Sequence, residues 1–439
     1  MKKNLAMNVA PGVIIAAAQS RSGKTTLTMA LLARLQRDNI PLAPFKAGPD
    51  YLDGAWHSLF SKQPCYNLDT FMVGPQECRT LFQHKRGAAL GIIEGVMGLY
   101  DGLNGVGGPG STAHLAQTLG LPVLLVVNVR GMAGSLIPLV QGFVSAAQGF
   151  TIVGILANQA GGQQHVERLS QWLDEYGLPP IVGWMGRENQ LVLQERHLGL
   201  TPPDASTLPS LGGLADALHL NQALFDAHFQ PLPAITEIPL RPLQPLLSGK
   251  TIAVAQDQAF SFIYPANVEC LHQMGARVHF FSPLAGDPLP DPCDAIWLPG
   301  GYPELYGQTL STSPSLKQVH HFGQQGGVIL AECGGMMALG DHIVDIDGRS
   351  WPMTGLLPIT TIMTPRLAGL GYRRESSGVR GHEFHHSIRH PSTLPAAFTV
   401  DRGDPGVRWA NVLASYVHWF FPSAPEVVSQ WFGGGNSVR

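Results

Sequence analysis

The most constraining feature of the sequence is a phosphate-loop motif that follows a short apolar run near the start of the chain. Residues Val13 to Ala18 are apolar and have the length of a buried strand. Leucines then recur with helical spacing from Leu27 to Leu35. Between them lies the motif, Ser22, Gly23, Lys24, Thr25 and Thr26. A strand, a tight turn and a helix in this order predict an α/β domain whose first turn binds phosphate.

The residue types of the motif suit ATP bound together with Mg²⁺. Backbone N–H groups and the helix N-terminus can bind phosphate oxygens, Lys24 can neutralise the β and γ phosphates, and the Thr25 hydroxyl can reach the metal. The first glycine of the usual pattern is Ala18 here, which leaves the strand, the Gly-Lys-Thr and the helix intact. The alternative is an ordinary turn with a surface lysine, and it would make Gly-Lys-Thr-Thr after a buried strand a coincidence. We therefore predict ATP binding by residues 22–26.

Two later strand ends carry charged side chains that phosphoryl transfer can use. Lys46, Asp50 and Asp53 follow one predicted strand, and Glu94 ends another. The carboxyl ends of strands in an open α/β sheet face the usual ligand crevice, and Mg²⁺ prefers oxygen ligands. We predict that Lys46 contacts ATP and that Thr25, Asp50 and Glu94 share one Mg²⁺. Taken singly, either aspartate is more often a solvated turn residue.

The strand and helix alternation occurs twice, which predicts two α/β domains with mostly parallel sheets. Apolar runs of strand length recur up to residue 157 and again from residue 251 to 331. Five prolines lie between Phe229 and Pro245, too many for a helix or a central strand. At 439 residues the chain also exceeds what one core usually organises. The predicted domains are 1–228 and 249–439, joined by a proline-rich linker over 229–248.

Composition and charge limit the kinds of molecule that we expect the protein to bind. The net charge is −3 and the 28 lysines and arginines form no basic run, so neither nucleic acid nor an anionic membrane surface is favoured. No apolar stretch approaches the ~18 residues of a membrane span. Five cysteines without paired spacing fit neither a disulfide framework nor a zinc module, and they favour a reducing cytoplasm. We expect a cytoplasmic protein that binds small molecules, and a homodimer is left open.

In the second domain, one cysteine stands where a nucleophile would. Residues Val328 to Ala331 form an apolar run, and Cys333 comes two residues later, directly before Gly334 and Gly335. Small neighbours permit a sharp strand-to-helix turn, and a helix N-terminus lowers the pKa of a thiol. A lone cysteine is more often core filler. The flanking glycines and a downstream histidine favour a nucleophile.

A glycine pair after another predicted strand can complete an oxyanion hole. Leu298 ends the strand, and Gly300 and Gly301 follow. We predict that the backbone N–H groups of Gly301 and Gly334 point to the same place and stabilise an oxyanion.

Two histidine clusters could supply the base. The first, residues 381–387, matches the pattern H-E-x-x-H, but a zinc protease needs that pattern on a helix, whereas Gly381 and Pro391 suit a strand and a turn. Zinc is therefore not expected. The second cluster, residues 414–420, contains His418 near the end of an apolar segment, where a histidine is usually a core residue.

In their order and spacing, these motifs resemble the family of cobyrinic acid a,c-diamide synthases, which includes the hydrogenobyrinic acid enzymes of aerobic cobalamin biosynthesis. The N-terminal half resembles dethiobiotin synthetase, and the C-terminal half resembles a class I glutamine amidotransferase. The resemblance spans nearly the whole chain. Besides the phosphate loop, it rests on Lys46 to Asp53, Glu94 to Gly102, Asp257 to Phe262, Leu298 to Tyr306, Ala331 to Met336, Gly371 to Arg373 and Gly381 to Ser387.

The resemblance implies a ligase that amidates the a and c acetate groups of a corrinoid polycarboxylate, cobyrinic or hydrogenobyrinic acid. ATP and Mg²⁺ would form an acyl phosphate, and glutamine would supply ammonia. The implied nucleophile is Cys333 and its base is His418, with Tyr51 and Asp53 as candidates for substrate contacts. The residues implied to bind ATP and Mg²⁺ are Lys24, Thr25, Asp50 and Glu94.

Two positions depart from the wider classes. Class I amidotransferases have a glutamate two residues after the histidine, and Phe420 stands there, so His418 lacks that orienting carboxylate. Asn128 stands where relatives of the nucleotide domain commonly have aspartate. Nickel-sirohydrochlorin a,c-diamide synthase is similar in motif and remains an alternative. So does a nucleotide-dependent binding protein or metallochaperone whose amidotransferase domain is inactive.

Overall fold

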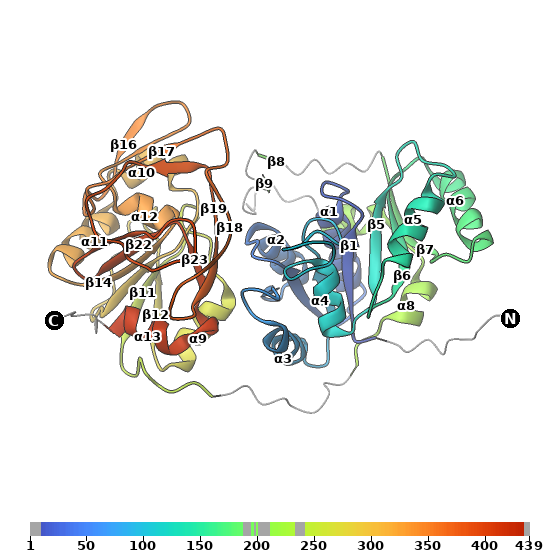
Figure 1. Ribbon diagram of the computed structural model, residues 1–439, viewed down its shortest axis with the longest axis horizontal. Coiled ribbons are helices and arrows are strands. Elements are labelled where there is room, and N and C mark those ends of the chain that lie inside the picture. Colours follow the sequence, from blue (N-terminus) through green and yellow to red (C-terminus); the bar gives the residue numbers. More distant parts are fainter. Residues whose placement is uncertain (1–9, 188–194, 197–198, 201–210, 233–241, 434–439) are drawn as a thin grey trace. The chain divides into compact units, whose positions relative to one another are not determined.

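The chain divides into two compact units, Met1–Leu240 and Arg241–Arg439 (Figure 1). The computed structural model describes residues 10–187, 195–196, 199–200, 211–232 and 242–433. The linker predicted over 229–248 spans the division, and its residues 233–241 lie outside the described ones. Among the described residues, no helix has the length and apolarity that a membrane span requires.

An eight-stranded sheet forms the centre of the first unit, in the order β10-β7-β6-β5-β1-β4-β2-β3. Its neighbours pair in parallel except for β10, which is antiparallel to β7. The strands are β1 (Gly12–Ala17), β2 (Leu42–Ala47), β3 (Tyr66–Leu68), β4 (Leu90–Glu94), β5 (Val123–Asn128), β6 (Ile152–Ala160), β7 (Ile181–Gly186) and β10 (Leu218–Leu220). The predicted α/β class is confirmed.

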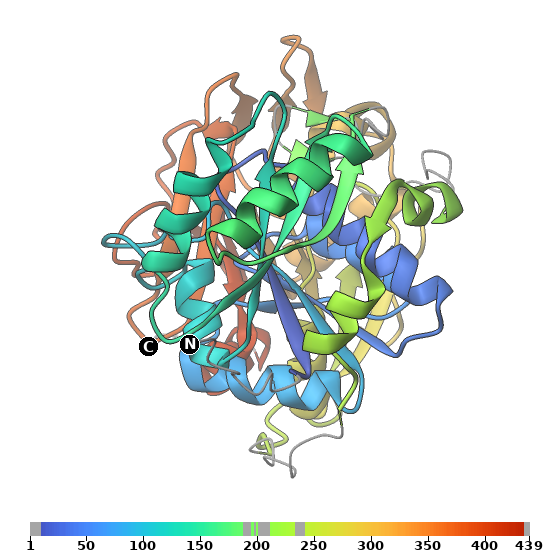
Figure 2. The ribbon, with the colours of Figure 1, turned by 90° about the vertical axis from the view of Figure 1, so that its right-hand side faces the viewer.

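Helices lie on both faces of this sheet (Figure 2). The first unit also holds a short antiparallel pair, β8 (Glu195–Arg196) with β9 (Gly199–Leu200). Its helices are α1 (Lys24–Arg37), α2 (Leu52–Ser61), α3 (Pro75–Arg86), α4 (Thr112–Leu119), α5 (Leu136–Ser145), α6 (Gln163–Glu175), α7 (Leu211–Ala217) and α8 (Gln222–His228).

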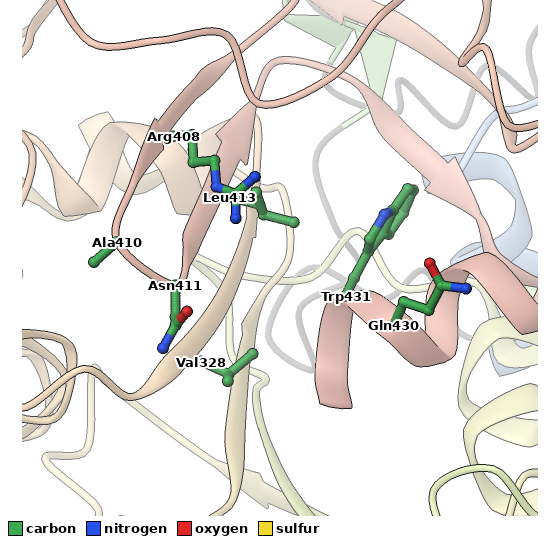
Figure 3. A pocket seen from close by; sticks show the side chains of 7 residues that line it. All are labelled: Val328, Arg408, Ala410, Asn411, Leu413, Gln430 and Trp431. Carbon is green, nitrogen blue, oxygen red and sulfur yellow. The ribbon is translucent and has the colours of Figure 1, made fainter. Parts of the chain in front are cut away.

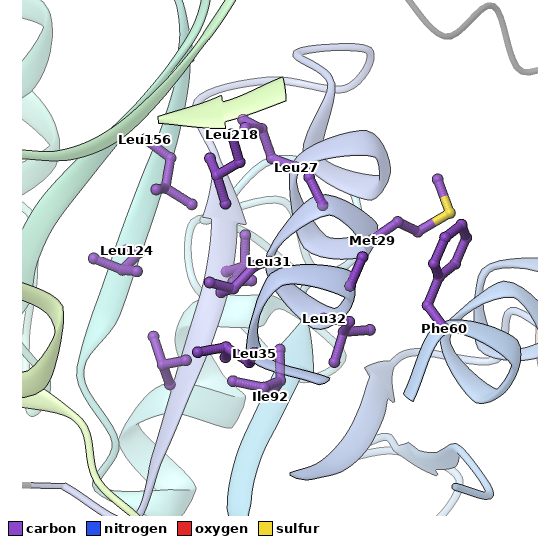
Figure 4. Close-up of a cluster of buried hydrophobic side chains, with 14 of the residues drawn as sticks. Leu27, Met29, Leu31, Leu32, Leu35, Phe60, Ile92, Leu124, Leu156 and Leu218 are labelled. Carbon is purple, nitrogen blue, oxygen red and sulfur yellow. The ribbon is translucent and has the colours of Figure 1, made fainter. Parts of the chain in front are cut away.

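The phosphate loop is fixed by the burial of α1 on one face of the sheet. Alternate residues of β1 and neighbouring strands meet the buried face of α1 there (Figure 4). Leu27, Leu31 and Leu35 are all at most 1% exposed, as their i, i+4 spacing predicts. Burying each leucine stabilises the fold by about 2 kcal/mol. Since Gly23 has no side chain with which to cap α1, packing positions this helix.

The second unit is built on a six-stranded sheet in the order β12-β11-β13-β14-β22-β21. Its neighbours are parallel except for β21, which pairs antiparallel with β22. The strands are β11 (Thr251–Ala255), β12 (Arg277–Phe281), β13 (Ala295–Leu298), β14 (Val328–Glu332), β21 (Val407–Trp409) and β22 (Val412–Ser415). The apolar runs of strand length predicted between residues 251 and 331 correspond to β11, β12, β13 and β14.

Two smaller sheets complete the second unit. One has the order β16-β15-β17-β20 and the other β18-β19-β23. Their strands are β15 (His342–Val344), β16 (Ser350–Pro352), β17 (Thr360–Met363), β18 (Gly369–Arg374), β19 (Arg380–His385), β20 (Ser387–Arg389) and β23 (His418–Phe420). The helices are α9 (Pro265–Gln273), η1 (Pro303–Tyr306), α10 (Gly307–Leu310), α11 (Pro314–Gln324), α12 (Gly334–Leu339), η2 (Phe421–Ser423) and α13 (Pro425–Gly433).

Candidate active sites

The phosphate loop joins β1 to α1 and is held by one side chain from β6. The Asn158 amide donates a hydrogen bond to the Ser22 carbonyl at 2.9 Å, and the Ser22 hydroxyl donates to the Gln19 carbonyl at 2.9 Å. Gly23 has φ 87°, and a Cβ there would overlap the Asn158 amide. Only glycine therefore fits at position 23. Thr26 lies in the first turn of α1. Sequence reasoning missed Asn158.

Glu94, at the end of β4, is the centre of a buried charge cluster. Its Oε1 accepts a hydrogen bond from the Thr25 hydroxyl at 2.7 Å, and it lies 3.9 Å from Lys24 Nζ and 3.8 Å from Lys46 Nζ. Its Oε2 lies 2.5 Å from His57 Nε2. The structure thus brings Lys24, Thr25, Lys46 and Glu94 together, as the motifs predict.

His57 was missed because no motif contains it. A signal was present, since on α2 it lies four residues after Asp53 and therefore on the same helix face. Asp53 Oδ2 is 3.3 Å from Lys46 Nζ, so both α2 side chains reach the cluster around Glu94.

Asp50 and Tyr51 lie at the start of α2, where Tyr51 is the N-cap residue. Asp50 Oδ1 accepts a hydrogen bond from the Asp53 N–H at 2.9 Å. The Asn67 amide donates to the Asp50 carbonyl at 2.8 Å and fixes the preceding loop. In the part of the chain that the structure describes, no group of three or more His, Cys, Asp or Glu is arranged to hold a metal ion. A Mg²⁺ site with the Thr25 hydroxyl stays a prediction.

Two members of the cluster, Glu94 and Lys46, keep their charges despite burial. Burial alone would raise the pKa of Glu94, but Lys46, His57 and Lys24 lower it well below its usual range. Burial would lower the pKa of Lys46, but Glu94 and Asp53 raise it above the ordinary value. Burial lowers the pKa of Lys24, and burial with two neighbouring carboxylates raises that of Asp53. At neutral pH an ionised Glu94 therefore faces ammonium groups, an arrangement that can hold phosphates and a hard cation.

In the second unit, Cys333 stands on the sharp turn that the sequence predicts. It follows β14, precedes α12 and has φ 46° and ψ −108°. Its N–H donates to the Ser415 carbonyl at 2.7 Å, which ties the turn to the end of β22. A Cβ on Gly335 would overlap the Leu298 carbonyl, so the helix can start this close to β13 only with glycine there.

The predicted lowering of the Cys333 pKa is wrong for the free protein. The residue is 5% exposed, and burial raises the pKa of its thiol above the ordinary value. Glu304 adds to this rise, while the Gly334 N–H opposes it. The helix that starts here has only six residues, and its dipole does not outweigh desolvation. Cys333 is therefore a neutral thiol at neutral pH.

His418 lies on β23 and is 1% exposed. Its ring stacks on His382, its partner across the β19–β23 ladder, with centroids 4.9 Å apart and planes at 17°. The Tyr264 hydroxyl lies 3.2 Å from His382 Nδ1. A Cβ on Gly300 would overlap the His418 ring, so this ring packs directly on the Gly300 backbone. Burial lowers the pKa of His418 well below its usual range, so the imidazole is neutral at neutral pH.

The Gly300-Gly301 loop lies beside both predicted catalytic residues, Cys333 and His418. Gly300 meets the His418 ring, and a Cβ on Gly334 would lie 3.0 Å from the Gly301 oxygen and 3.1 Å from its nitrogen. Gly334 directly follows Cys333. The structure therefore places Cys333, His418, Gly301 and Gly334 around one loop, and a thiol, an imidazole and backbone N–H groups in this arrangement suit acyl transfer.

The H-E-x-x-H pattern runs along β19, ends at His386 just after that strand, and is not on a helix, as the sequence predicts. Glu383 pairs with Arg373 Nε at 2.5 Å and with His385 Nε2 at 2.8 Å. His385 in turn stacks on Tyr416 with centroids 3.7 Å apart. These contacts are those of a packed structural network.

The two residues that depart from the family patterns, Phe420 and Asn128, make ordinary packing and hydrogen-bond contacts. Phe420 is buried and meets Tyr264 edge to face at 5.8 Å, so no carboxylate reaches His418 from this position. Asn128 ends β5, and its side chain accepts a hydrogen bond from the Arg130 N–H at 3.0 Å.

A crevice at the other end of β14 is not part of either site (Figure 3). It holds about 10 Å³, roughly the space of one water. It begins at Val328, the first residue of β14, whereas Cys333 follows the last. Its lining residues are Val328, Arg408, Ala410, Asn411, Leu413, Gln430 and Trp431.

Comparison with known proteins assigns each unit to a family model. Residues 13–198 match the CobQ/CobB/MinD/ParA nucleotide binding domain, and residues 251–426 match the CobB/CobQ-like glutamine amidotransferase domain.

Curated relatives match nearly the whole chain. The cobyrinate a,c-diamide synthase of Herminiimonas arsenicoxydans is 37% identical over 97% of both chains. That of Salmonella typhimurium is 35% identical over 97% of this chain and 98% of its own. The hydrogenobyrinate a,c-diamide synthase of Brucella ovis is 38% identical over 93% of this chain and 98% of its own. The chain therefore belongs to the family of cobyrinate and hydrogenobyrinate a,c-diamide synthases, glutamine-dependent ligases with a nucleotide-binding domain.

Proposed function

We propose that the protein amidates the a and c acetate carboxylates of cobyrinic or hydrogenobyrinic acid, with ATP as energy source and glutamine as nitrogen source. Relatives bearing either name align with nearly the whole chain, which supports a corrinoid substrate and leaves both rings open. The observation that carries the proposal is the packing of one glycine loop against the His418 ring and the residue after Cys333. A binding protein with an inactive amidotransferase domain would have no use for it.

The first unit activates the carboxylate. A carboxylate resists attack by ammonia, so one of its oxygens first bonds to the γ phosphorus of ATP while the bond to ADP breaks. Ammonia then attacks the acyl carbon, phosphate leaves, and the nitrogen loses a proton. The phosphate loop, Lys24 and Lys46 hold the phosphates and neutralise the charge that moves to ADP. Tyr51 and Asp53, at the start of α2, are the proposed substrate contacts.

The donor set beside the phosphate loop fits Mg²⁺. Thr25 and Glu94 present oxygen atoms 2.7 Å apart, and Asp50 is the proposed third ligand. When bound, the ion neutralises phosphate charge.

The second unit releases ammonia from glutamine. The Cys333 sulfur bonds to the side-chain amide carbon, and His418 accepts the thiol proton and passes it to the leaving ammonia. The N–H groups of Gly301 and Gly334 stabilise the oxyanion. Water then hydrolyses the thioester to glutamate. Because thiol and imidazole both start neutral, proton transfer accompanies the attack and does not precede it.

The decisive experiment separates the two nitrogen sources. The full chain is incubated with ATP, Mg²⁺, glutamine and, in separate tubes, cobyrinic acid, hydrogenobyrinic acid or nickel-sirohydrochlorin, and each ring is followed by mass spectrometry. Two successive acid-to-amide changes in one tube identify the ring. Cys333→Ala should abolish product formation from glutamine and retain it from ammonium. Product from glutamine in that variant would contradict the assigned nucleophile.

A cytoplasmic location is part of the proposal. All five cysteines are free thiols, as expected in a reducing compartment. Homodimerisation is left open.

A further inference from the structure

Glu332, the residue before Cys333, has a carboxyl group buried at a junction of three strands. The residue is 1% exposed. Its Oε1 accepts a hydrogen bond from the Trp419 N–H at 2.9 Å, and its Oε2 accepts one from the Trp297 indole N–H at 3.1 Å. Glu332 ends β14, Trp297 lies in β13 and Trp419 lies in β23.

Each of these strands leads to one part of the glutaminase site. β14 leads to Cys333, β13 leads to the Gly300-Gly301 loop, and Trp419 directly follows His418. β14 and β13 belong to the six-stranded sheet and β23 to a different one. The Glu332 carboxyl group therefore links β23, which carries His418, to β14, which leads to Cys333, across two sheets.

Burial raises the pKa of Glu332 to about 8, although the Trp419 and Trp297 N–H groups oppose the rise, so at neutral pH the side chain is mostly a neutral carboxyl group whose oxygens accept both N–H groups. A buried polar group here needs a reason, because an apolar residue of similar volume avoids the cost of desolvation. Class I amidotransferases orient their histidine with a carboxylate two residues later, and Phe420 occupies that position. Glu332 instead accepts a hydrogen bond from the N–H of Trp419, the residue next to His418.

We propose that Glu332 is the positioning residue of the glutaminase site and that it fixes His418 relative to Cys333 through the Trp419 N–H, in place of the carboxylate that position 420 lacks. The inference rests on the proposed roles of Cys333 and His418. The His382 ring and the Gly300 backbone limit the tilt of the His418 ring, and Glu332 fixes the backbone that carries it.

The test uses the full chain and four variants. Glu332→Gln keeps the size but has one acceptor oxygen, so its NH₂ group faces one of the two N–H donors. Trp297→Phe removes the indole N–H donor. In the double variant the single oxygen of Gln at position 332 can then accept the hydrogen bond of the Trp419 N–H without competition from the indole. Asp294→Asn is the control, because Asp294 also accepts a backbone N–H, from Thr251 at 2.8 Å, but at the start of β11.

Glutamine hydrolysis is measured as kcat and KM, and folding by near-ultraviolet circular dichroism. We expect Glu332→Gln to lower kcat by about 10-fold to 100-fold with KM within about twofold. Trp297→Phe should lower kcat by only about threefold, and the double variant should recover most of the loss of Glu332→Gln. Asp294→Asn should keep wild-type kcat.

Three results would overturn the proposal. These are an unchanged kcat in folded Glu332→Gln, a loss that Asp294→Asn shares, and a folded double variant as inactive as Cys333→Ala. If Glu332→Gln does not fold, the double variant decides, since it keeps the hydrogen bond to Trp419. Failure of the proposed function is distinguishable, because the wild-type chain would then not hydrolyse glutamine, or Cys333→Ala would hydrolyse it as fast as the wild type.

Discussion

The two sites occupy the same place in similar sheets but are built from opposite electrostatics. Each lies where a parallel strand ends and a helix begins. Around Glu94 the protein buries charged groups, and the Glu94 carboxylate and the Lys46 ammonium group stay ionised. Around Cys333 it buries a thiol and an imidazole that stay neutral.

The difference follows from what each site must stabilise. Phosphate groups arrive with charge, so the first site needs fixed countercharges in a water-poor setting. Glutamine arrives with a neutral side-chain amide, and the charge develops only during attack, so N–H groups of the backbone suffice. The contrast predicts that charge removal harms one site and that small changes of packing harm the other.

Glu94→Gln should have the largest effect. Removing this charge leaves Lys24 and Lys46 without their shared partner and removes a proposed metal ligand. We expect amidation to fall by about a thousandfold with glutamine and with ammonium alike. Mass spectrometry of the ring measures it, and Glu77→Gln, an exposed carboxylate on α3, serves as the control. If Glu94→Gln still amidated the ring from ammonium, the charge of Glu94 would be dispensable in the first site.

Gly300→Ala should harm only the second site. The added Cβ overlaps the His418 ring and must displace it. A displacement of about 1 Å in a catalytic group costs on the order of 100-fold, so glutamine hydrolysis should drop by that factor while amidation from ammonium stays. Gly433→Ala, where a Cβ meets nothing within 4 Å, is the matched control. Equal losses in both variants would count against the packing role.

The pH dependence of Cys333 alkylation tests the neutral thiol. Below its pKa a thiol is ionised tenfold less for each pH unit, and burial raises the pKa of Cys333. Iodoacetamide labelling should therefore speed up about tenfold per unit from about pH 7 to 9 without levelling off. Peptide mass spectrometry separates Cys333 from the other cysteines. A plateau below about pH 8 would indicate an activated thiolate instead.

Asn158→Ala should have the smallest effect. It removes one hydrogen bond to the Ser22 carbonyl, worth about 1 kcal/mol, so binding of an ATP analogue should weaken about fivefold. Titration calorimetry measures the affinity. Asn221→Ala removes a helix cap elsewhere in the same unit and should leave affinity unchanged. An unchanged affinity in Asn158→Ala would mean that the loop holds its shape without this bond.

The sequence predicted most of the central strands because they are continuous apolar runs, as in β11 and β13. It did not predict β18, whose residues Gly369 to Arg374 show no alternation of apolar and polar side chains. Strands of this kind form through pairing with neighbours and cannot be found from their own composition.

The candidate ATP-binding and catalytic residues lie in short motifs that the sequence shows, whereas most of the residues that support them lie outside any motif. His57, Asn158 and Glu332 contact partners 37, 136 and 87 residues away. The thiol pKa was predicted in the wrong direction because burial depends on the whole fold and outweighs a helix N-terminus that the sequence shows plainly.

The turn at Cys333 has an evolutionary consequence. A non-glycine residue at φ 46° costs about 1–3 kcal/mol, a cost that selection tolerates only while the thiol is needed. A lineage that came to rely on free ammonium would be expected to replace Cys333 early, and glycine would relieve the backbone. Among descendants of this fold, glycine at this position would therefore mark the loss of glutamine as nitrogen donor.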